Sequence, residues 1–180
     1  MALGEFIRKA MSAPGGDTTD RNDDELVAPD VAPASDNPMY LFGKDNLPGI
    51  AADLVPPRLF EGTAFTEWSA SDRREHALFF LGPAHSGAYF HQHFSAWNAL
   101  LYGAKRWFLL PPDAVFGPYT ASMVNWLAVD KSRLPIPPLE CVQESGEILF
   151  VPEGWLHATI NLQDSVGIAV ELGPTGNEGS

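Results

Sequence analysis

The sequence predicts an all-β fold. Its second half contains eight short segments that are rich in aromatic and β-branched residues and are bounded by Gly, Pro, Asn or Asp. Short segments at such close spacing are typical of a β-sandwich or barrel. The chain has 180 residues and is 45% hydrophobic, so one domain with a substantial core is expected. The predicted strands are 77–82, 87–93, 95–102, 105–110, 139–143, 147–151, 155–162 and 165–172.

The residues before these strands are expected to be less regular. Residues 5–11 have the composition of one or two helical turns, whereas residues 12–38 are rich in Pro, Gly, Ser, Asp and Asn. That composition predicts a flexible segment, and regular structure is expected from residue 39 onwards. A helical turn is expected at 49–54, where flanking prolines prevent a longer helix. Residues 61–75 are polar and are predicted to form a loop.

Three connections between the predicted strands have recognisable patterns. The sequence Tyr-Gly-Ala-Lys at 102–105 predicts a tight hairpin. A second hairpin is predicted over 147–157, because a strand ending in Val-Pro is followed by Gly-Trp and a further strand. Residues 119–128 are the best candidate for a helix inserted between strands. Cys141 is expected to be a small buried residue.

Charge and hydropathy exclude several classes of function. The formal net charge is −12, and residues 1–38 alone contain eight acidic and three basic residues. Binding to a nucleic-acid backbone or to an anionic membrane surface is therefore not expected. No apolar run is long enough for a membrane span, and the first residues lack the apolar core of a secretory signal. A single cysteine excludes an internal disulfide and a cysteine-rich zinc site.

One stretch has the opposite character. Residues 77–112 contain no Asp or Glu but include Lys105, Arg106 and three of the five histidines. Buried strands would explain the absence of acids, because charged residues are rarely buried without a partner. The alternative is a pocket for a small anion, since a lysine in an apolar segment needs a counter-ion.

Three histidines have a spacing that suits a metal. His91 and His93 are two residues apart, so on a strand both imidazoles would lie on the same face. The predicted hairpin over 147–157 would return His157 to the same end of the sheet. Three such ligands with open coordination positions would form a facial triad. A histidine satisfied within the core remains the alternative for His157, and His76 and His85 are assigned to the surface.

Two segments carry a resemblance to a known family. FLGPAHSGAYFHQHFSAWNALLYGAKRWFLLPP at 80–112 and LECVQESGEILFVPEGWLHATINLQDSVGIAVELG at 139–173 resemble the two metal-binding segments of the JmjC (jumonji-C) domain family. That family is a branch of the cupin-like oxygenases. The resemblance implies a double-stranded β-helix (a cupin-like jelly roll), with the inserted helix as an addition. It also implies Fe(II) and 2-oxoglutarate as cofactors, hydroxylation or demethylation of a protein substrate, and the lumen of the secretory pathway as location.

The family's functional residues match this chain at several positions. His91 and His157 match the first and last metal ligands. Lys105 matches the lysine that binds the distal carboxylate of 2-oxoglutarate, and Asn98 matches an asparagine that lines the same co-substrate pocket. These matches agree with the residue chemistry, because a lysine in an acid-free pocket can bind a dicarboxylate.

The chain also departs from the family pattern. His93 stands where the family has Asp or Glu as the middle ligand, which leaves a bound metal one charge more positive and also suits Zn(II). Ala88 replaces a Thr or Ser hydroxyl. Ala169 and Glu171 replace Thr and Asn, and Glu171 is either a solvated residue at the rim or a repulsive charge for a dicarboxylate.

These observations predict three parts and leave three functions open. The parts are a flexible segment at 1–38, a JmjC domain at 39–173 that is short or lacks its first strands, and a tail at 174–180. The leading function is a 2-oxoglutarate-dependent protein hydroxylase. The others are an inactive JmjC module that binds a protein partner, and a three-histidine cupin that acts on a small molecule. The oligomeric state, the substrate and the metal are not predicted.

Overall fold

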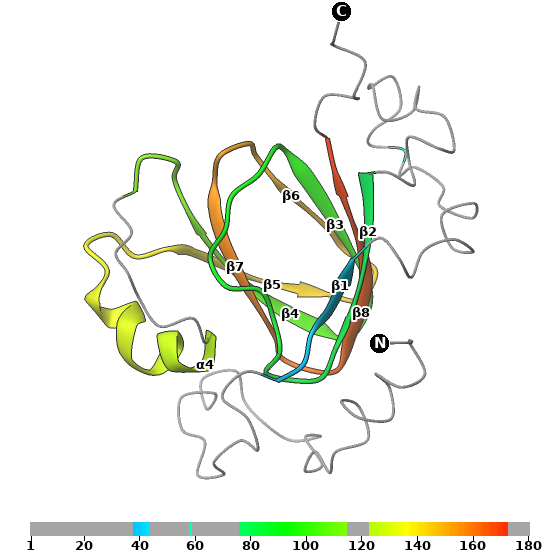
Figure 1. Cartoon of the computed structure of the whole chain (residues 1–180), viewed down its shortest axis with the longest axis horizontal. Coiled ribbons are helices and arrows are strands. Elements are labelled where there is room, and N and C mark those ends of the chain that lie inside the picture. Colours follow the sequence, from blue (N-terminus) through cyan, green and yellow to red (C-terminus); the bar gives the residue numbers. More distant parts are fainter. Residues whose placement is uncertain (1–37, 44–57, 59–75, 115–122, 173–180) are drawn as a thin grey trace, which may run out of the picture.

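The computed structural model describes residues 38–43, 58, 76–114 and 123–172, and these form two antiparallel sheets (Figure 1). The larger sheet has five strands in the order β1-β2-β8-β3-β6, and the smaller has three in the order β5-β4-β7. The strands are β1 (Leu41–Gly43), β2 (Ala77–Gly82), β3 (Ala96–Tyr102), β4 (Ala104–Leu110), β5 (Leu139–Glu144), β6 (Ile148–Val151), β7 (Leu156–Asn161) and β8 (Ser165–Glu171). The all-β, double-stranded β-helix prediction is confirmed.

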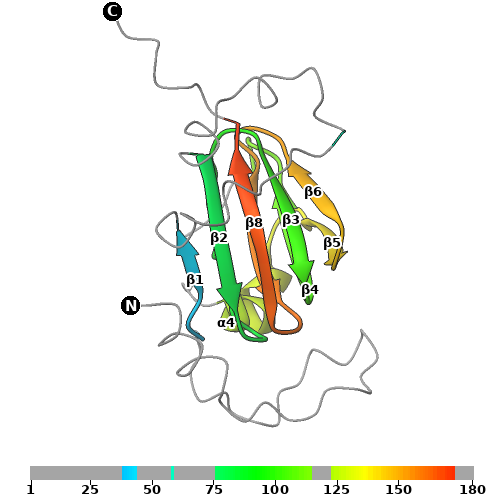
Figure 2. The same ribbon diagram turned by 90° about the vertical axis from the view of Figure 1, so that its right-hand side faces the viewer.

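The larger sheet is seen nearly face-on in Figure 2, with β8 between β2 and β3. Its two faces differ because successive residues in a strand point to opposite sides. One face carries a buried apolar cluster of Ala77, Phe79, Trp97, Ile168 and Val170. The neighbouring positions in these strands, which include Asn98 and Ala169, belong to the opposite face and line a pocket.

A short helical segment packs against the smaller sheet (Figure 1). It consists of α4 (Met123–Asn125), a π-helical turn (Trp126–Asp130) and a 3₁₀ turn (Lys131–Arg133). Met123 and Trp126 pack with Phe108, Ala158 and Ile160. The predicted helix at 119–128 is thus present from residue 123, and residues 119–122 lie outside the described residues. No helix in the described ranges is long and apolar enough to cross a membrane.

Both predicted hairpins were wrong in their pairing. Gly103 makes the predicted tight turn with a φ of 91°, but it joins β3 in the larger sheet to β4 in the smaller one. A side chain at this position would collide with the carbonyl of Asp164. Residues 152–155 likewise join β6 and β7, which also belong to different sheets. Alternation of polar and apolar residues predicts a strand but not which sheet the strand joins.

The predicted strand at 87–93 was also wrong. This segment follows β7 with irregular pairing, because Ala88 lies opposite Thr159 whereas His91 lies opposite His157. The two positions are three residues apart along the segment but only two residues apart along β7. One extra residue on one side of a strand pair is a β-bulge. Gly87 allows the close approach, since a side chain there would collide with the Thr159 carbonyl. The expectations for residues 1–37, 49–54, 61–75 and 174–180 lie outside the described residues.

Gln143 on β5 connects the two sheets. Its buried side-chain amide donates to the carbonyls of Asn98, at 2.9 Å, and Glu147, at 3.0 Å. Its Oε1 accepts a hydrogen bond from Nε1 of Trp107 at 2.9 Å. One side chain thus satisfies groups on β3, on β4 and in the turn before β6.

We expect the Gln143→Leu substitution to destabilise the protein by about 3 kcal/mol, because two carbonyls and an indole N–H would lose their buried partner. The measurement is the free energy of unfolding in urea. The exposed Gln163 offers a matched control, and Gln163→Leu should change stability by less than about 0.5 kcal/mol. Equal effects of the two substitutions would show that Gln143 does not couple the sheets.

Candidate metal centre

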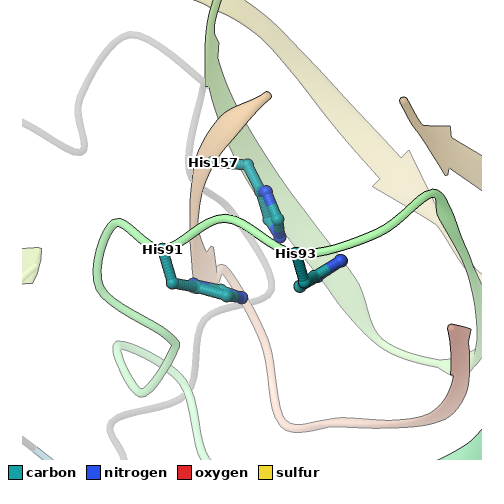
Figure 3. Close-up of side chains that lie close together, drawn as sticks. All are labelled: His91, His93 and His157. Atoms are coloured by element: carbon teal, nitrogen blue, oxygen red, sulfur yellow. The ribbon is translucent and has the colours of Figure 1, made fainter. Parts of the chain in front are cut away.

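Backbone pairing brings three histidines together (Figure 3). His91 and His157 form an isolated β-bridge in which each N–H donates to the other's carbonyl, at 3.1 and 3.0 Å. His93 follows two residues later, and its carbonyl accepts a hydrogen bond from the N–H of Gly154 at 3.0 Å. The segment before β3 therefore supplies two imidazoles, and β7 supplies the third.

The three rings surround a common space (Figure 3). Their centroids are 4.2 Å apart for His91 and His157, 4.6 Å for His93 and His157, and 5.4 Å for His91 and His93. One ligand atom from each ring lies within 4.8 Å of the other two. This is a spacing at which a single ion can contact all three rings after small movements of the side chains.

Hydrogen bonds to the backbone fix the tautomer of each ring. The Nδ1 atom of His91 lies 2.7 Å from the carbonyl of Tyr89, and that of His157 lies 2.9 Å from the carbonyl of Trp155. The Nδ1 of His93 lies 2.6 Å from the carbonyl of Phe94. A carbonyl oxygen only accepts, so each Nδ1 carries the hydrogen. Nε2 is then the atom left with a lone pair for a metal.

Burial keeps two of these rings neutral. It lowers the pKa of His157 to about 3, with a further lowering by the neighbouring His91. Burial also lowers the pKa of His91, and the effect exceeds the opposing one of its hydrogen bond to Tyr89. A metal ligand must be unprotonated, so both rings are ready to bind a cation at neutral pH.

The histidines lie at one end of a pocket between the two sheets. The same pocket reaches Lys105 on β4, whose neighbours on the same face of the strand include Trp107. The lining residues are Tyr40, Phe42, Ala88, His91, His93, Ala96, Trp97, Asn98, Lys105, Trp107, Val151, His157, Thr159 and Ala169. About half of them are apolar, so the polar groups among the others would decide what binds.

Lys105 is buried without an anionic partner among the described residues. Only 1% of its surface is exposed, and its Nζ donates to the Oδ1 of Asn161 at 2.6 Å and to the hydroxyl of Tyr40 at 3.1 Å. It also lies over the rings of Phe80 and Tyr40, 4.5 and 5.0 Å from their centroids. Burial lowers the pKa of Lys105 to about 7. An anion beside Nζ would favour the charged form again.

The two neutral partners of Lys105 are themselves held in place. The Asn161 amide donates to the hydroxyl of Ser86 at 3.0 Å and to the carbonyl of Gly82 at 3.3 Å, which turns its oxygen toward Lys105. Burial raises the pKa of Tyr40 well above its usual value, so this phenol remains neutral.

Asn98 has an unsatisfied atom in the same pocket. The residue is 6% exposed, and its Oδ1 has no hydrogen-bond partner among the described residues. A buried amide oxygen without a partner is uncommon and indicates a place for a donor from a ligand or water. The structure thus places Asn98 and Lys105, the two predicted co-substrate residues, on the same pocket as the histidine cluster.

Sequence reasoning missed the two residues that hydrogen-bond Lys105, namely Asn161 and Tyr40. Asn161 could have been found, because it follows His157 and Thr159 at two-residue intervals on one face of β7. Tyr40 had no local signal, since it reaches Lys105 across 65 positions of sequence. Cys141 was predicted to be buried but is exposed, because β5 is an edge strand with one neighbour. His76 and His85 lie outside the cluster, as expected.

The donors present fit a divalent transition metal. Neutral imidazoles suit iron, cobalt, nickel, copper and zinc, and the three residues leave further coordination positions for other ligands. The buried lysine in the same pocket fits a second component that carries an anionic group, and the unsatisfied Asn98 oxygen could accept a hydrogen bond from a donor on a ligand or from water. The site can therefore hold a metal and a small anionic molecule side by side.

Comparisons with known proteins show the family to which this chain belongs. The sequence model of the cupin-like domain family matches residues 18–172. JmjC domain-containing protein 8 of Mus musculus is 33% identical over 154 residues, which cover 83% of this chain and 55% of that protein. The bifunctional arginine demethylase and lysyl-hydroxylase psr-1 of Caenorhabditis briggsae is 33% identical over 151 residues, or 70% of this chain and 38% of that protein.

A solved structure also matches part of the chain. It is the ribosomal oxygenase YcfD of Escherichia coli in complex with cobalt and 2-oxoglutarate, at 19% identity and a TM-score of 0.39. The match covers 57% of this chain and 24% of that one. This chain spans about half or less of the length of the two curated relatives. The match to the family model over most of the chain and the similarity to JmjC proteins show that the chain belongs to the family of cupin-like JmjC domains.

Proposed function

We propose that this chain is a 2-oxoglutarate-dependent oxygenase with Fe(II) at its three histidines, and that it hydroxylates a side chain of a protein substrate. The observation that carries this proposal is the shared pocket. A cluster of three imidazoles and a buried lysine without an anionic partner among the described residues line the same cavity. A dicarboxylate with a 2-oxo acid group at one end has the chemistry to satisfy both.

The residues of the chain would have separate tasks. His91, His93 and His157 would hold the metal through Nε2. Lys105, with the Tyr40 hydroxyl beside it, would bind the distal carboxylate, because a charge-assisted hydrogen bond in a dry site is strong. When bound, iron would activate dioxygen and 2-oxoglutarate would supply two electrons for its reduction, chemistry that no protein side chain can supply.

The side chains that form the pocket walls fit these separate roles of the histidines and Lys105. Trp107 packs against His157, with 6.1 Å between ring centroids, and Ala96 and Val151 add apolar surface. An apolar wall excludes water from a site where a reactive oxidant would otherwise be lost to side reactions. The hydrogen bonds from Nδ1 hold the ring of each histidine in one orientation.

The names of the relatives support a protein substrate. One relative is named for reactions on arginine and lysine, and a further one is the 2-oxoglutarate and iron-dependent oxygenase JMJD4 of Homo sapiens. Because this chain spans only part of each, the substrate remains part of the proposal. The non-catalytic module and the cupin for a small molecule gain no support from these names.

The first test concerns the metal. We expect His157→Ala to weaken binding of Mn(II), used as a stable substitute for Fe(II), by about 100-fold, because one of three ligands is lost. The control is His85→Ala, which removes an exposed histidine outside the cluster and should leave the Kd unchanged. Isothermal titration calorimetry measures the Kd of both variants.

Succinate release from 2-oxoglutarate with Fe(II) and candidate peptides then tests activity. Wild-type protein that binds no metal and forms no succinate would contradict the proposal.

The second test concerns Lys105. Its pKa of about 7 means that the amine loses its proton above pH 7 in the free protein. Binding of a dicarboxylate must then restore that proton, so affinity for 2-oxoglutarate should fall by up to about tenfold for each pH unit above 7. Below pH 7 Lys105 is already protonated in the free protein, so its titration should leave the affinity for 2-oxoglutarate nearly constant.

Calorimetric titration of the Mn(II)-loaded protein below and above pH 7 measures this dependence. Lys105→Met should bind 2-oxoglutarate weakly and without the pH slope. Lys131→Met is the matched control, because Lys131 pairs with Glu140 at the surface and should keep the wild-type profile. A profile that is the same in all three proteins would rule out Lys105 as the carboxylate-binding residue.

A further inference from the structure

Among the residues that the structure describes, the histidine cluster contains no anionic ligand. Three neutral imidazoles leave the full charge of a divalent cation in place, and Lys105 adds a further positive charge to the same pocket when it is protonated. Two positive charges in one apolar cavity are unfavourable without a nearby anion. The question is which group of this chain supplies negative charge at the end of the pocket where the histidines lie.

Glu171 is placed at that end. It is the last residue of β8 and lies directly opposite Ala96 on β3, which in turn lies opposite Val151 on β6. Residues directly opposite each other in an antiparallel pair project to the same face of the sheet. Ala96 and Val151 line the pocket, so Glu171 continues the same row at the pocket rim.

The alternation along β8 gives the same placement independently. Ala169 lines the pocket, and Glu171 follows two residues later on the same face of the strand. Glu171 is half-buried. The two ion pairs found among the described residues are Arg106–Glu140 and Lys131–Glu140, so neither of them neutralises its charge.

The backbone also joins this end of β8 to the segment that carries His93. The N–H of Leu172, which follows Glu171, donates to the carbonyl of Ser95 at 2.6 Å. Ser95 lies two residues after His93, so Glu171 is beside the segment that supplies two of the three imidazoles.

We propose that Glu171 is the anionic group of this metal site, a carboxylate at the rim that offsets the charge of a divalent cation held by three neutral histidines. The proposal rests on the proposed metal-binding role of those histidines. Glu171 acts from outside the ligand set, because in the described part of the chain the ligand atoms that lie within 4.8 Å of one another are those of the three histidines. Its carboxylate thus acts on the metal through its charge and does not coordinate it.

The test is the affinity for Co(II), whose absorption spectrum also reports its ligands. Glu171→Gln keeps the shape of the side chain and removes the charge, so we expect the Kd for Co(II) to rise about tenfold. The matched control is Glu153→Gln, which removes an exposed charge in the turn before β7 and should change the Kd by less than about twofold. Equal effects of the two substitutions would overturn the proposal.

Two further measurements separate the roles that Glu171 could have. The ligand-field bands of the Co(II) complex should keep their positions in Glu171→Gln, and a changed spectrum would overturn the placement of Glu171 outside the ligand set. His93→Asp provides a charge within the ligand set, so Glu171→Gln in that background should raise the Kd by less than about threefold. An undiminished effect in that background would overturn charge compensation as its role.

The outcome for the wild-type protein separates this inference from the proposed function. If the wild-type chain binds no Co(II), the metal site itself is wrong and both proposals fail. If it binds Co(II) and Glu171→Gln behaves as Glu153→Gln does, only the role of Glu171 fails. Urea unfolding of the metal-free variants should give equal stabilities, since a difference there would indicate a structural role for Glu171 instead.

Discussion

A buried ammonium group surrounded by neutral partners is the interaction on which much of this structure depends. Nζ of Lys105 is held by an amide oxygen, a phenol and two aromatic rings. Burying a charge in this way is costly unless its hydrogen-bonding groups are satisfied. The demands of that one group account for the orientation of Asn161, for the position of Tyr40 at the start of the described fold, and for the hydroxyl of Ser86 behind them.

The uneven charge along the chain follows from the same constraint. The protein is acidic overall, yet residues 77–112 contain no Asp or Glu. A carboxylate beside Lys105 would neutralise the lysine permanently and close the pocket to an external anion. Instead, Lys105 has no anionic partner among the described residues of a protein with net charge −12. Under the proposed function, a diffusing dicarboxylate would meet a general repulsion at long range, which salt screens, and a specific attraction at short range.

The sequence predicted the chemistry of the site better than its architecture. The three histidines at 91, 93 and 157 were identified from residue type and spacing. Lys105 was identified from its acid-free surroundings and from the resemblance to JmjC domains, and Asn98 from that resemblance alone. The structure brings all five to one pocket. The strand at 87–93 was wrong because a bulge depends on the partner strand, whose position is not encoded locally. Both hairpins were wrong for a related reason, since tight turns in this fold connect different sheets. Tyr40 could not have been predicted, because nothing near it in sequence reports its contact with Lys105.

The segment at 85–91 pairs along one side with β7, and this pairing links metal binding to the local stability of the fold. Four residues of this segment exchange backbone hydrogen bonds with β7, namely His85, Ser86, Ala88 and His91. Two of the three imidazoles lie on or just beyond this segment and the third lies on β7 itself. A bound ion would therefore act as a cross-link between a weakly held segment and the smaller sheet. Loss of the ion would first increase local unfolding of that segment, so its amide hydrogens would exchange faster. The amide hydrogens in the rest of both sheets would stay protected.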